Sequence, residues 1–251
     1  MILLEELINQ LEVLLPGNGL VDYCPNGLQV EGKKSIKSIA TAVSGSLETI
    51  HLAIQSGADA LIVHHGIFWN HDKHGIKGVL KEKIYGLLAN GISLFAYHLP
   101  LDLHPSLGNN WKAALDLGWK DLQPFGYVNG VPIGVKGRVQ TESRDQIQKK
   151  LEGYYGHQAT CAFGGKENIE TLALISGGSY KSILEAAKAR VDGFITGSFD
   201  EPAWHQAFEE KINFFALGHS ATERVGPIAL AKHLELQFQI PCRFLDVYNP
   251  F

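Results

Sequence analysis

The stretch SIKSIATAVSGSLETIHLAIQSGADALIVHH, residues 35–65, decides the fold class. Residues 36–43 are β-branched or small, which is typical of a strand, and residues 47–56 have the apolar spacing of a helix that ends at Gly57. Residues 60–63 form a short, continuously apolar run, as in a strand that is buried on both faces. A strand, a helix and a second buried strand in this order predict a parallel βαβ unit.

The same alternation of helices and strands continues on both sides of that unit. Before residue 124 the apolar spacing predicts a strand over residues 92–97 and helices over residues 3–15, 78–90 and 109–117. Glycines then become dense, and we expect an irregular strand over 131–139 and a helix over 143–151. The alternation resumes with predicted strands at 171–176, 193–196, 213–217 and 243–247 and helices at 180–190, 201–210 and 220–236.

These elements predict an α/β protein built from a duplicated α/β unit with mostly parallel sheets. Residues 44–65 align without gaps on residues 177–198, and six of the 22 aligned positions are identical, which favours a duplication. We expect residues 1–123 and 167–251 to form two interlinked α/β halves that carry the functional site. We expect residues 124–166 to form a smaller α+β insertion.

Composition excludes several classes of protein. The 251 residues are 45% hydrophobic and 19% charged, as in an ordinary globular protein. The formal net charge is −4 and no block of Lys and Arg stands out, which argues against nucleic-acid binding. The apolar runs are far too short for a membrane span. Three scattered cysteines without a CxxC motif and an N-terminus without a signal-peptide pattern favour a reducing compartment, the cytoplasm.

Histidines and carboxylates gather at the ends of three predicted strands. One strand ends in a His-His pair, the second in a single histidine, and the third in Gly-His; the last two are each followed four residues later by an acidic residue. In an open α/β sheet, ligands bind beyond the carboxyl ends of the strands, so these side chains are expected at one edge. The residues concerned are His64, His65, His98, Asp102, His219 and Glu223.

This set of side chains has the chemistry of a metal centre, because imidazole nitrogens and carboxylates together suit divalent zinc, iron or manganese. Neighbouring residues within a strand point to opposite faces, but the alternation breaks at the end of the strand. His64 can then serve one metal and His65 another. Asp102 and Glu223 are candidates for bridging two metals about 3.5–4 Å apart. We therefore expect two divalent metal ions per chain.

Each of these residues also has a purely structural interpretation. A histidine at a strand end is commonly a hydrogen-bonded turn residue, and Asp102 has a place in a turn after Pro100. Ser220 and Glu223 have the spacing of a helix capping box.

Other residues near this edge are weaker candidates. The tripeptide Gly177-Gly178-Ser179 follows a predicted strand, so it either cradles a phosphate or forms a tight turn. His71, His74 and His104 lie in polar segments, and we expect them at the surface or around the ligands.

Five motifs, in this order along the chain, resemble those of a known family. They are Tyr23-Cys-Pro-Asn-Gly-Leu-Gln-Val30, Ile62-Val-His-His-Gly-Ile-Phe-Trp69, His98-Leu-Pro-Leu-Asp-Leu-His104, Phe194-Ile-Thr-Gly197 and Gly218-His-Ser-Ala-Thr-Glu-Arg224. They are similar to the signatures of the Nif-three-like dinuclear-metal-centre family, whose bacterial members are named as type 2 homologues of GTP cyclohydrolase I. The resemblance runs from about Leu4 to Pro250.

The resemblance implies a fold, a ligand set and an assembly. It implies the Nif-three-like fold, with two metals per chain held by the five ligands His64, His65, Asp102, His219 and Glu223. His98 matches a position beside that centre and is either a proton shuttle or a sixth ligand. The resemblance also implies a homo-oligomeric ring, commonly a hexamer, in which the metal sites face an inner cavity.

The leading functional hypothesis is a metal-dependent hydrolase that acts on a small molecule, such as the purine ring of GTP or a related nucleotide. In that reaction water attacks C8 of the purine, formate leaves after ring opening, and His98 transfers the proton. Two alternatives use the same residues: a phosphoesterase-type metallohydrolase, and a non-catalytic metal-binding, regulatory or metal-carrier protein. A purine-sized pocket with a group that reads guanine favours the first hypothesis, and exchangeable metal without an organic pocket favours the last.

Overall fold

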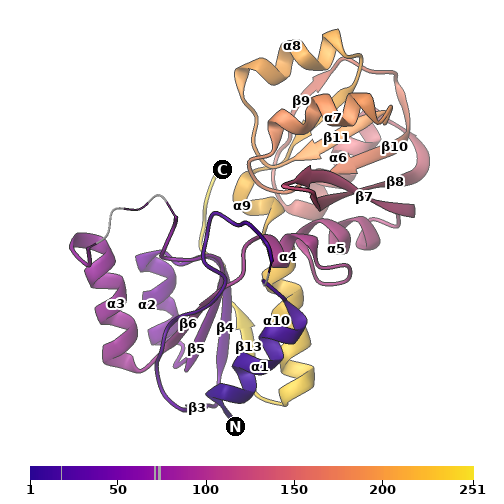
Figure 1. Cartoon of the computed structure of the whole chain (residues 1–251). Helices are drawn as coiled ribbons and strands as arrows, with labels where there is room; N and C mark the ends of the chain where they lie inside the picture. Colours follow the sequence, from indigo (N-terminus) through magenta and orange to yellow (C-terminus); the bar gives the residue numbers. More distant parts are fainter. Residues whose placement is uncertain (18, 71, 73–74) are drawn as a thin grey trace. The chain divides into compact units, whose positions relative to one another are not determined.

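The computed structural model describes residues 1–251 except residues 18, 71 and 73–74 (Figure 1). The chain divides into two compact units, of which the first comprises Met1–His104 and Gly226–Tyr248 and the second Pro105–Val225 and Asn249–Phe251. This division differs from the expected one. Residues 124–166 do not stand apart, because they supply strands to the sheet of the second unit.

The first unit contains a five-stranded sheet in the order β13-β4-β5-β6-β2. Strands β4 (Ile39–Ser44), β5 (Ala60–His65) and β6 (Ser93–Ala96) run parallel, and β13 (Cys242–Phe244) joins them in parallel beside β4. Strand β2 (Gly27–Val30) closes the other edge antiparallel to β6. The first sheet is therefore mostly parallel, as the βαβ pattern predicts.

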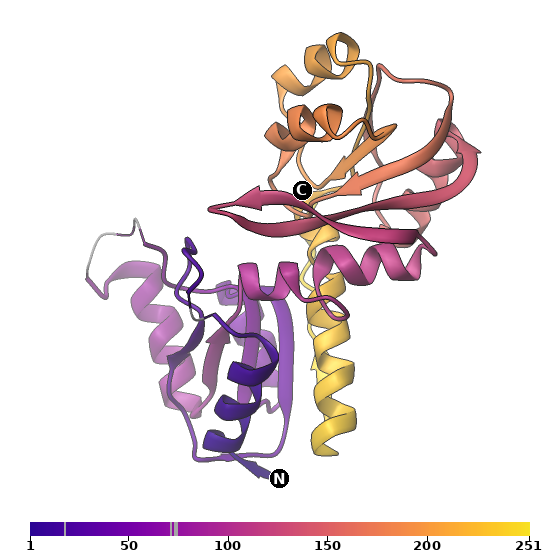
Figure 2. The ribbon, with the colours of Figure 1, turned by 45° about the vertical axis from the view of Figure 1, so that its right-hand side comes forward.

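Helices cover both faces of this sheet. Figures 1 and 2 show α2 (Leu47–Gln55) and α3 (Gly78–Asn90) on one face, and α1 (Leu4–Leu14) and α10 (Val225–Phe238) on the other. This cover explains why Leu61, Ile62 and Val63 in β5 are all buried although their side chains alternate between the two faces. Two further short strands, β1 (Ile2–Leu3) and β3 (Ser35–Ile36), pair with each other.

The second unit contains a six-stranded mixed sheet in the order β7-β8-β10-β11-β12-β9. Its centre is parallel and consists of β10 (Asn168–Leu174), β11 (Gly193–Thr196) and β12 (Asn213–Ala216). The antiparallel strands are β7 (Lys120–Val128), β8 (Val131–Ser143) and β9 (Thr160–Phe163). The segment expected as an insertion thus makes this sheet mixed by adding antiparallel strands around its parallel centre.

The helices of the second unit also lie on both faces of its sheet. Helices α5 (Asn109–Asp116) and α6 (Arg144–Tyr155) share a hydrophobic core with Leu172 and Leu174 of β10. Ala173 points to the opposite face, because side chains alternate along a strand. Helix α7 (Ile183–Lys188), which follows the 3-10 helix η1 (Tyr180–Ser182), packs with α8 (Glu201–Glu209).

The duplication inferred from the sequence has a structural counterpart. In each unit, three parallel strands are connected by two helices, β4-α2-β5-α3-β6 in the first and β10-α7-β11-α8-β12 in the second. The aspartates at the start of β5 and β11 make matching contacts. The Asp59 carboxylate accepts a hydrogen bond from Lys37 N (2.8 Å) and pairs with Lys33 Nζ (3.2 Å).

Asp192 repeats these contacts 133 residues later in the chain. Its carboxylate accepts a hydrogen bond from Glu170 N (2.9 Å) and pairs with Lys166 Nζ (3.1 Å). Glu170 and Lys166 likewise lie 133 residues after Lys37 and Lys33, the two partners of Asp59. The repeat therefore extends beyond the 22 aligned positions.

The structure differs from the sequence expectations in several elements, three of which overlap the family motifs. The helix expected over residues 220–236 is two helices, α9 (His219–Thr222) and α10, with Glu223 and Arg224 between them. Residues Leu99–Leu103 form an unexpected short helix, α4, with Pro100 in its first turn, where proline is tolerated. Residues 27–30 form a further strand without a counterpart among the expected elements, β2. Among the described residues, no helix is long and apolar enough to cross a membrane.

The buried strand β5 gives a stability prediction. We expect Leu61→Ala to lower the free energy of unfolding by about 2–5 kcal/mol, because it opens a cavity in the core. Leu88→Ala is the matched control. Leu88 is exposed on α3, so its truncation should change stability by less than about 0.5 kcal/mol. Urea denaturation measures both values, and equal effects of the two variants would contradict this description of the core.

Candidate metal centre

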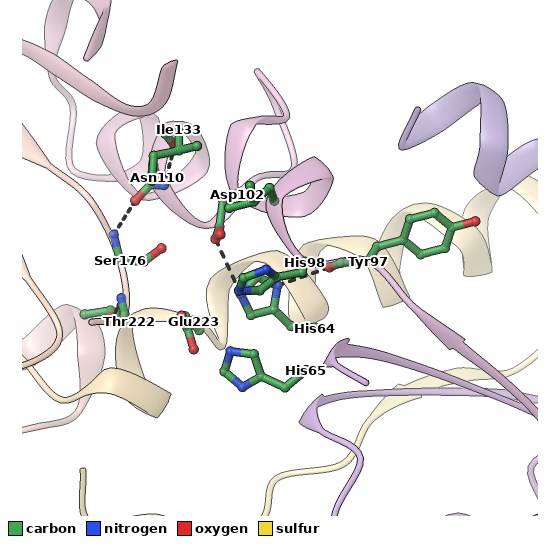
Figure 3. A network of polar contacts seen from close by, with 12 residues as sticks. His64, His65, Tyr97, His98, Asp102, Asn110, Ile133, Ser176, Thr222 and Glu223 are labelled. Carbon is green, nitrogen blue, oxygen red and sulfur yellow. Dashed lines mark hydrogen bonds and ion pairs between the residues drawn. The ribbon is translucent and has the colours of Figure 1, made fainter. Parts of the chain in front are cut away.

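Three imidazole rings come together at the carboxyl end of the first sheet. His64 and His65 are the last two residues of β5, and His98 follows β6. The ring centroids of His64 and His65 are 4.7 Å apart, and those of His64 and His98 are 4.9 Å apart (Figure 3). One ligating atom from each of the three rings lies within 4.8 Å of the others, so these histidines could hold a metal ion.

The Nδ1 atom of His64 is committed to a hydrogen bond within the protein. It lies 3.1 Å from the carbonyl oxygen of Tyr97, in the segment after β6 (Figure 3). Because a carbonyl oxygen can only accept, Nδ1 must carry the proton, and in the neutral ring Nε2 then offers its lone pair. Metal-ligating histidines are commonly fixed in this way by a partner at the other nitrogen.

The other three histidines also have an oxygen atom of the protein beside Nδ1. His98 Nδ1 lies 2.6 Å from Asp22 Oδ1. His65 Nδ1 lies 3.1 Å from Ser44 Oγ, and His219 Nδ1 lies 3.4 Å from Ser198 Oγ; each hydroxyl can accept from the ring. Every candidate histidine therefore has Nδ1 engaged by its own unit, so coordination or proton transfer would use Nε2.

Asp102 lies beside His64 in the first unit. It belongs to α4, and its backbone N–H donates to the carbonyl oxygen of His98 (3.3 Å). The segment for which the sequence suggests a turn after Pro100 is therefore a short helix. Its buried carboxylate oxygen lies 3.6 Å from His64 Nε2, which is too long for a hydrogen bond (Figure 3).

His219 and Glu223 form the corresponding pair in the second unit. His219 begins α9 and Glu223 follows that helix, so the two side chains are one turn apart. His219 Nε2 lies 3.2 Å from Glu223 Oε2, and the Glu223 side chain is buried. The capping-box interpretation is wrong, because Ser220 lies inside α9 and the residue before this helix is Gly218.

Glycines provide the space that this pair occupies. A Cβ atom on Gly177 would lie 2.1 Å from Glu223 Oε1 and 3.2 Å from His219 Nε2, and one on Gly197 would lie 2.6 Å from the His219 Cα. Gly177 also has φ +67°, a left-handed conformation that favours glycine. The tripeptide after β10 is thus a tight turn that packs against His219 and Glu223. The close approach of Gly197 to His219 explains why the Phe194-Ile-Thr-Gly197 motif ends in glycine.

Asn110 holds this turn in place from α5. Its Oδ1 accepts a hydrogen bond from Ser176 N (2.7 Å), and its Nδ2 donates to the carbonyl oxygen of Ile133 (2.7 Å), as Figure 3 shows. On the other side, Thr222 Oγ1 accepts from Gly177 N (3.0 Å). The start of the turn is therefore anchored from two sides within the second unit.

The spacing of the donor atoms fits metal coordination. Two ligands that lie about 2.0–2.2 Å from one tetrahedral ion are roughly 3.4 Å apart. The separations of 3.6 Å between His64 Nε2 and Asp102 Oδ1, and of 3.2 Å between His219 Nε2 and Glu223 Oε2, lie on either side of that value. A buried carboxylate is also costly unless a cation or hydrogen bonds compensate it. Each unit thus presents an imidazole and a carboxylate suited to one cation.

Sequence reasoning missed Asp22. Burial raises the pKa of its carboxyl, but hydrogen bonds from His98 and Asn26 outweigh that effect and bring the pKa to about 2. Asp22 directly precedes the first family motif, but nothing in its neighbourhood in the sequence points to His98, 76 residues away.

The three weaker candidates are His71, His74 and His104. His71 and His74 lie outside the described residues. Burial, together with nearby His233, lowers the pKa of His104, which is partly exposed in the first unit.

Comparison with known proteins identifies the family. The model of the Duf34/NIF3 (NGG1p interacting factor 3) family matches residues 2–250. The chain belongs to this family. It is 49% identical over 251 residues to a GTP cyclohydrolase 1 type 2 homolog of Chlamydia pneumoniae and 38% identical over 251 residues to one of Escherichia coli K12, with 98% of each chain covered in both cases.

A solved structure of a protein from Thermus thermophilus is similar to this chain with a TM-score of 0.91 at 35% identity, with 100% of both chains covered. The family resemblance seen in the motifs and the α/β fold class are thereby confirmed.

The glycine turn generates a prediction. We expect Gly177→Ala to cost more stability than Gly130→Ala, because both residues have a left-handed φ but only Gly177 is crowded. Gly130→Ala should cost about 1–2 kcal/mol, and Gly177→Ala about 1–3 kcal/mol more, since Glu223 must move. Chemical denaturation of both variants tests this. Equal losses would show that the turn does not pack tightly against Glu223.

Proposed function

We propose that this DUF34/NIF3 protein is a hydrolase that depends on two divalent metal ions. The single observation that carries the proposal concerns His64, His65, His98 and His219. Each of these histidines has its Nδ1 atom, rather than Nε2, in contact with an oxygen atom of its own unit. Two carboxylates among the donors would balance the charge of the cations. The proposed ligands are His64, His65, Asp102, His219 and Glu223.

Both proposed carboxylate ligands lie close in sequence to the points where the chain passes from one unit to the other. The chain passes from the first unit to the second after His104 and returns after Val225. Each crossing comes two residues after a proposed carboxylate ligand, Asp102 or Glu223. Five ligands also exceed what one four-coordinate ion takes up, which supports two ions rather than one. Zinc, iron and manganese all suit this mixture of nitrogen and oxygen donors.

Metals bound by these residues would supply Lewis-acid activation of water and of the substrate. The residues of the chain supply orientation and proton transfer. The hydrogen bonds at Nδ1 hold each imidazole in one pose, so binding costs little reorganisation. His98 Nε2 would accept the proton of the attacking water, and the resulting imidazolium would return it to the leaving nitrogen.

The substrate class that we propose is a purine nucleotide such as GTP, because the relatives carry the name GTP cyclohydrolase 1 type 2 homolog. In that reaction one water adds its oxygen to C8 and the imidazole ring opens. A second water hydrolyses the resulting formamide to formate and an amine.

Assembly and location are proposed on separate grounds. The family resemblance supports a homohexameric ring. The three cysteines are all free, which is compatible with the reducing cytoplasm.

Metal content gives the first test of this function. We expect elemental analysis of protein reloaded with zinc, iron or manganese to give about two ions per chain. Glu223→Ala should lower that number, whereas Glu209→Ala, which removes an exposed glutamate of α8, should not. Metal-free protein after reloading would refute the metal centre. Intact metal content with a lower melting temperature in Glu223→Ala would assign Glu223 a structural role.

Turnover gives the second test. We expect the metal-loaded protein to hydrolyse GTP, a chelator to abolish the activity, and added metal to restore it. His98→Ala should slow turnover about 10²–10⁴-fold with unchanged metal content, because it removes the proton-transfer group. Loss of metal in His98→Ala would make His98 a sixth ligand. Turnover of phosphoesters alone would favour the phosphoesterase hypothesis, and no turnover at all the carrier hypothesis.

A further inference from the structure

The segment of residues 22–29, here called the Asp22 segment, has no role in the proposed function, yet it reaches the ends of both histidine-bearing strands. It contains most of the first family motif and leads into β2 at the edge of the first sheet. The side chains of Asp22, Asn26 and Gln29 make hydrogen bonds to the segments that follow β5 and β6.

The Asp22 carboxylate is the centre of these contacts. Its Oδ1 accepts from His98 Nδ1 (2.6 Å) and from Tyr23 N (2.6 Å). Its Oδ2 accepts from Leu99 N (3.0 Å) and from Asn26 Nδ2 (2.9 Å). The Asp22 side chain is 4% exposed and that of His98 is 14% exposed, so water competes little with the bond between them. A carboxylate surrounded by donors on both oxygens acts only as an acceptor.

Two further side chains fix the backbone around the histidines. Asn26 Oδ1 accepts a hydrogen bond from His98 N (2.8 Å), so both the backbone and the ring of His98 are held. Gln29 Oε1 accepts from Ile67 N (2.9 Å), just after the His64-His65 pair. A Cβ atom on Gly66 would lie 2.4 Å from Gln29 Nε2 and 2.8 Å from the Cβ of Ala96, which cannot swing away, so glycine is needed there.

The pose of His98 has a consequence for its second nitrogen. With Nδ1 directed at Asp22, Nε2 lies on the opposite side of the ring. The His98 centroid is 4.9 Å from that of His64 and 5.6 Å from those of His65 and Trp69. His98 is therefore held between Asp22 and the imidazoles of β5.

We propose that Asp22 is a positioning residue that fixes the neutral ring of His98 in the Nδ1–H tautomer and thereby presents its Nε2 lone pair beside His64 and His65. The use of that lone pair for proton transfer rests on the proposed function. The tautomer itself does not, because it is a property of the chain that is measurable without metal or substrate.

The Asp22→Asn substitution would change the donor and acceptor groups that face His98. The amide of the new side chain offers one acceptor oxygen and two new N–H donors, where the carboxylate offered two oxygens to five donors. Among the partners, Leu99 N, Tyr23 N and Cys24 N remain donors, and the Asn26 amide nitrogen does too. His98 alone can become an acceptor at Nδ1, by moving its proton to Nε2. Asp22→Asn should therefore shift the ring toward the Nε2–H tautomer.

The experiment is magic-angle-spinning NMR of full-length, metal-free protein labelled with 15N in its histidines, at a pH where neutral imidazole is observed. The resonances of His98 are identified by their loss in His98→Gln. We expect Nδ1–H in the unmodified protein and Nε2–H as the major form in Asp22→Asn. Asp59→Asn is the matched control, since Asp59 is also a largely buried carboxylate of the first unit that binds a backbone N–H, and it should leave His98 unchanged.

The outcomes are distinct. An Nε2–H ring in the unmodified protein overturns the proposal even if Asp22→Asn does not fold, and so does an unchanged tautomer in folded Asp22→Asn. The same shift in Asp59→Asn also overturns it, because the effect would then be general destabilisation. Absence of metal binding or turnover would refute the proposed function and leave the role of Asp22 standing.

Discussion

The hydrogen bond from His64 Nδ1 to the carbonyl oxygen of Tyr97 is the interaction on which the arrangement of the first donor set depends. It joins the ends of β5 and β6, it satisfies one nitrogen of a fully buried imidazole, and it decides which ring nitrogen carries the lone pair. His98 and Asp102 follow from it in space, because both belong to the segment that begins at Tyr97. The rings of His98 and His65 are held in addition by Asp22 and Ser44.

The second unit positions its imidazole and its carboxylate with different residues. There Ser198, which follows β11, contacts Nδ1 of His219, and a glycine turn after β10 leaves room for Glu223. Close approach of backbone to a carboxylate is possible only where no Cβ intervenes, which is why glycine is required at position 177. A duplicated α/β unit thus presents imidazole and carboxylate donors at the carboxyl ends of strands in both copies, with the carboxylate on or just after a short helix each time.

The sequence alone was sufficient to predict features that depend on neighbouring residues of the chain. Buried strands appear as continuous apolar runs, so β5 and the histidines at its end could be predicted. Helix α4 could not, because five residues are too few for a periodicity. The break at Glu223 could not either, since the apolar spacing continues across it. Asp22 was missed for another reason: its partner His98 is brought beside it only by the pairing of β2 with β6, which no local pattern indicates.

The most direct test of the central claim is a crystal structure of the zinc-loaded protein with anomalous scattering measured at the zinc edge. The account predicts two anomalous peaks per chain. It also predicts Nε2, rather than Nδ1, of His64, His65 and His219 about 2.0–2.1 Å from a zinc ion, with Asp102 and Glu223 completing the ligand set. A single peak, ligation through Nδ1, or zinc bound away from these five residues would contradict it.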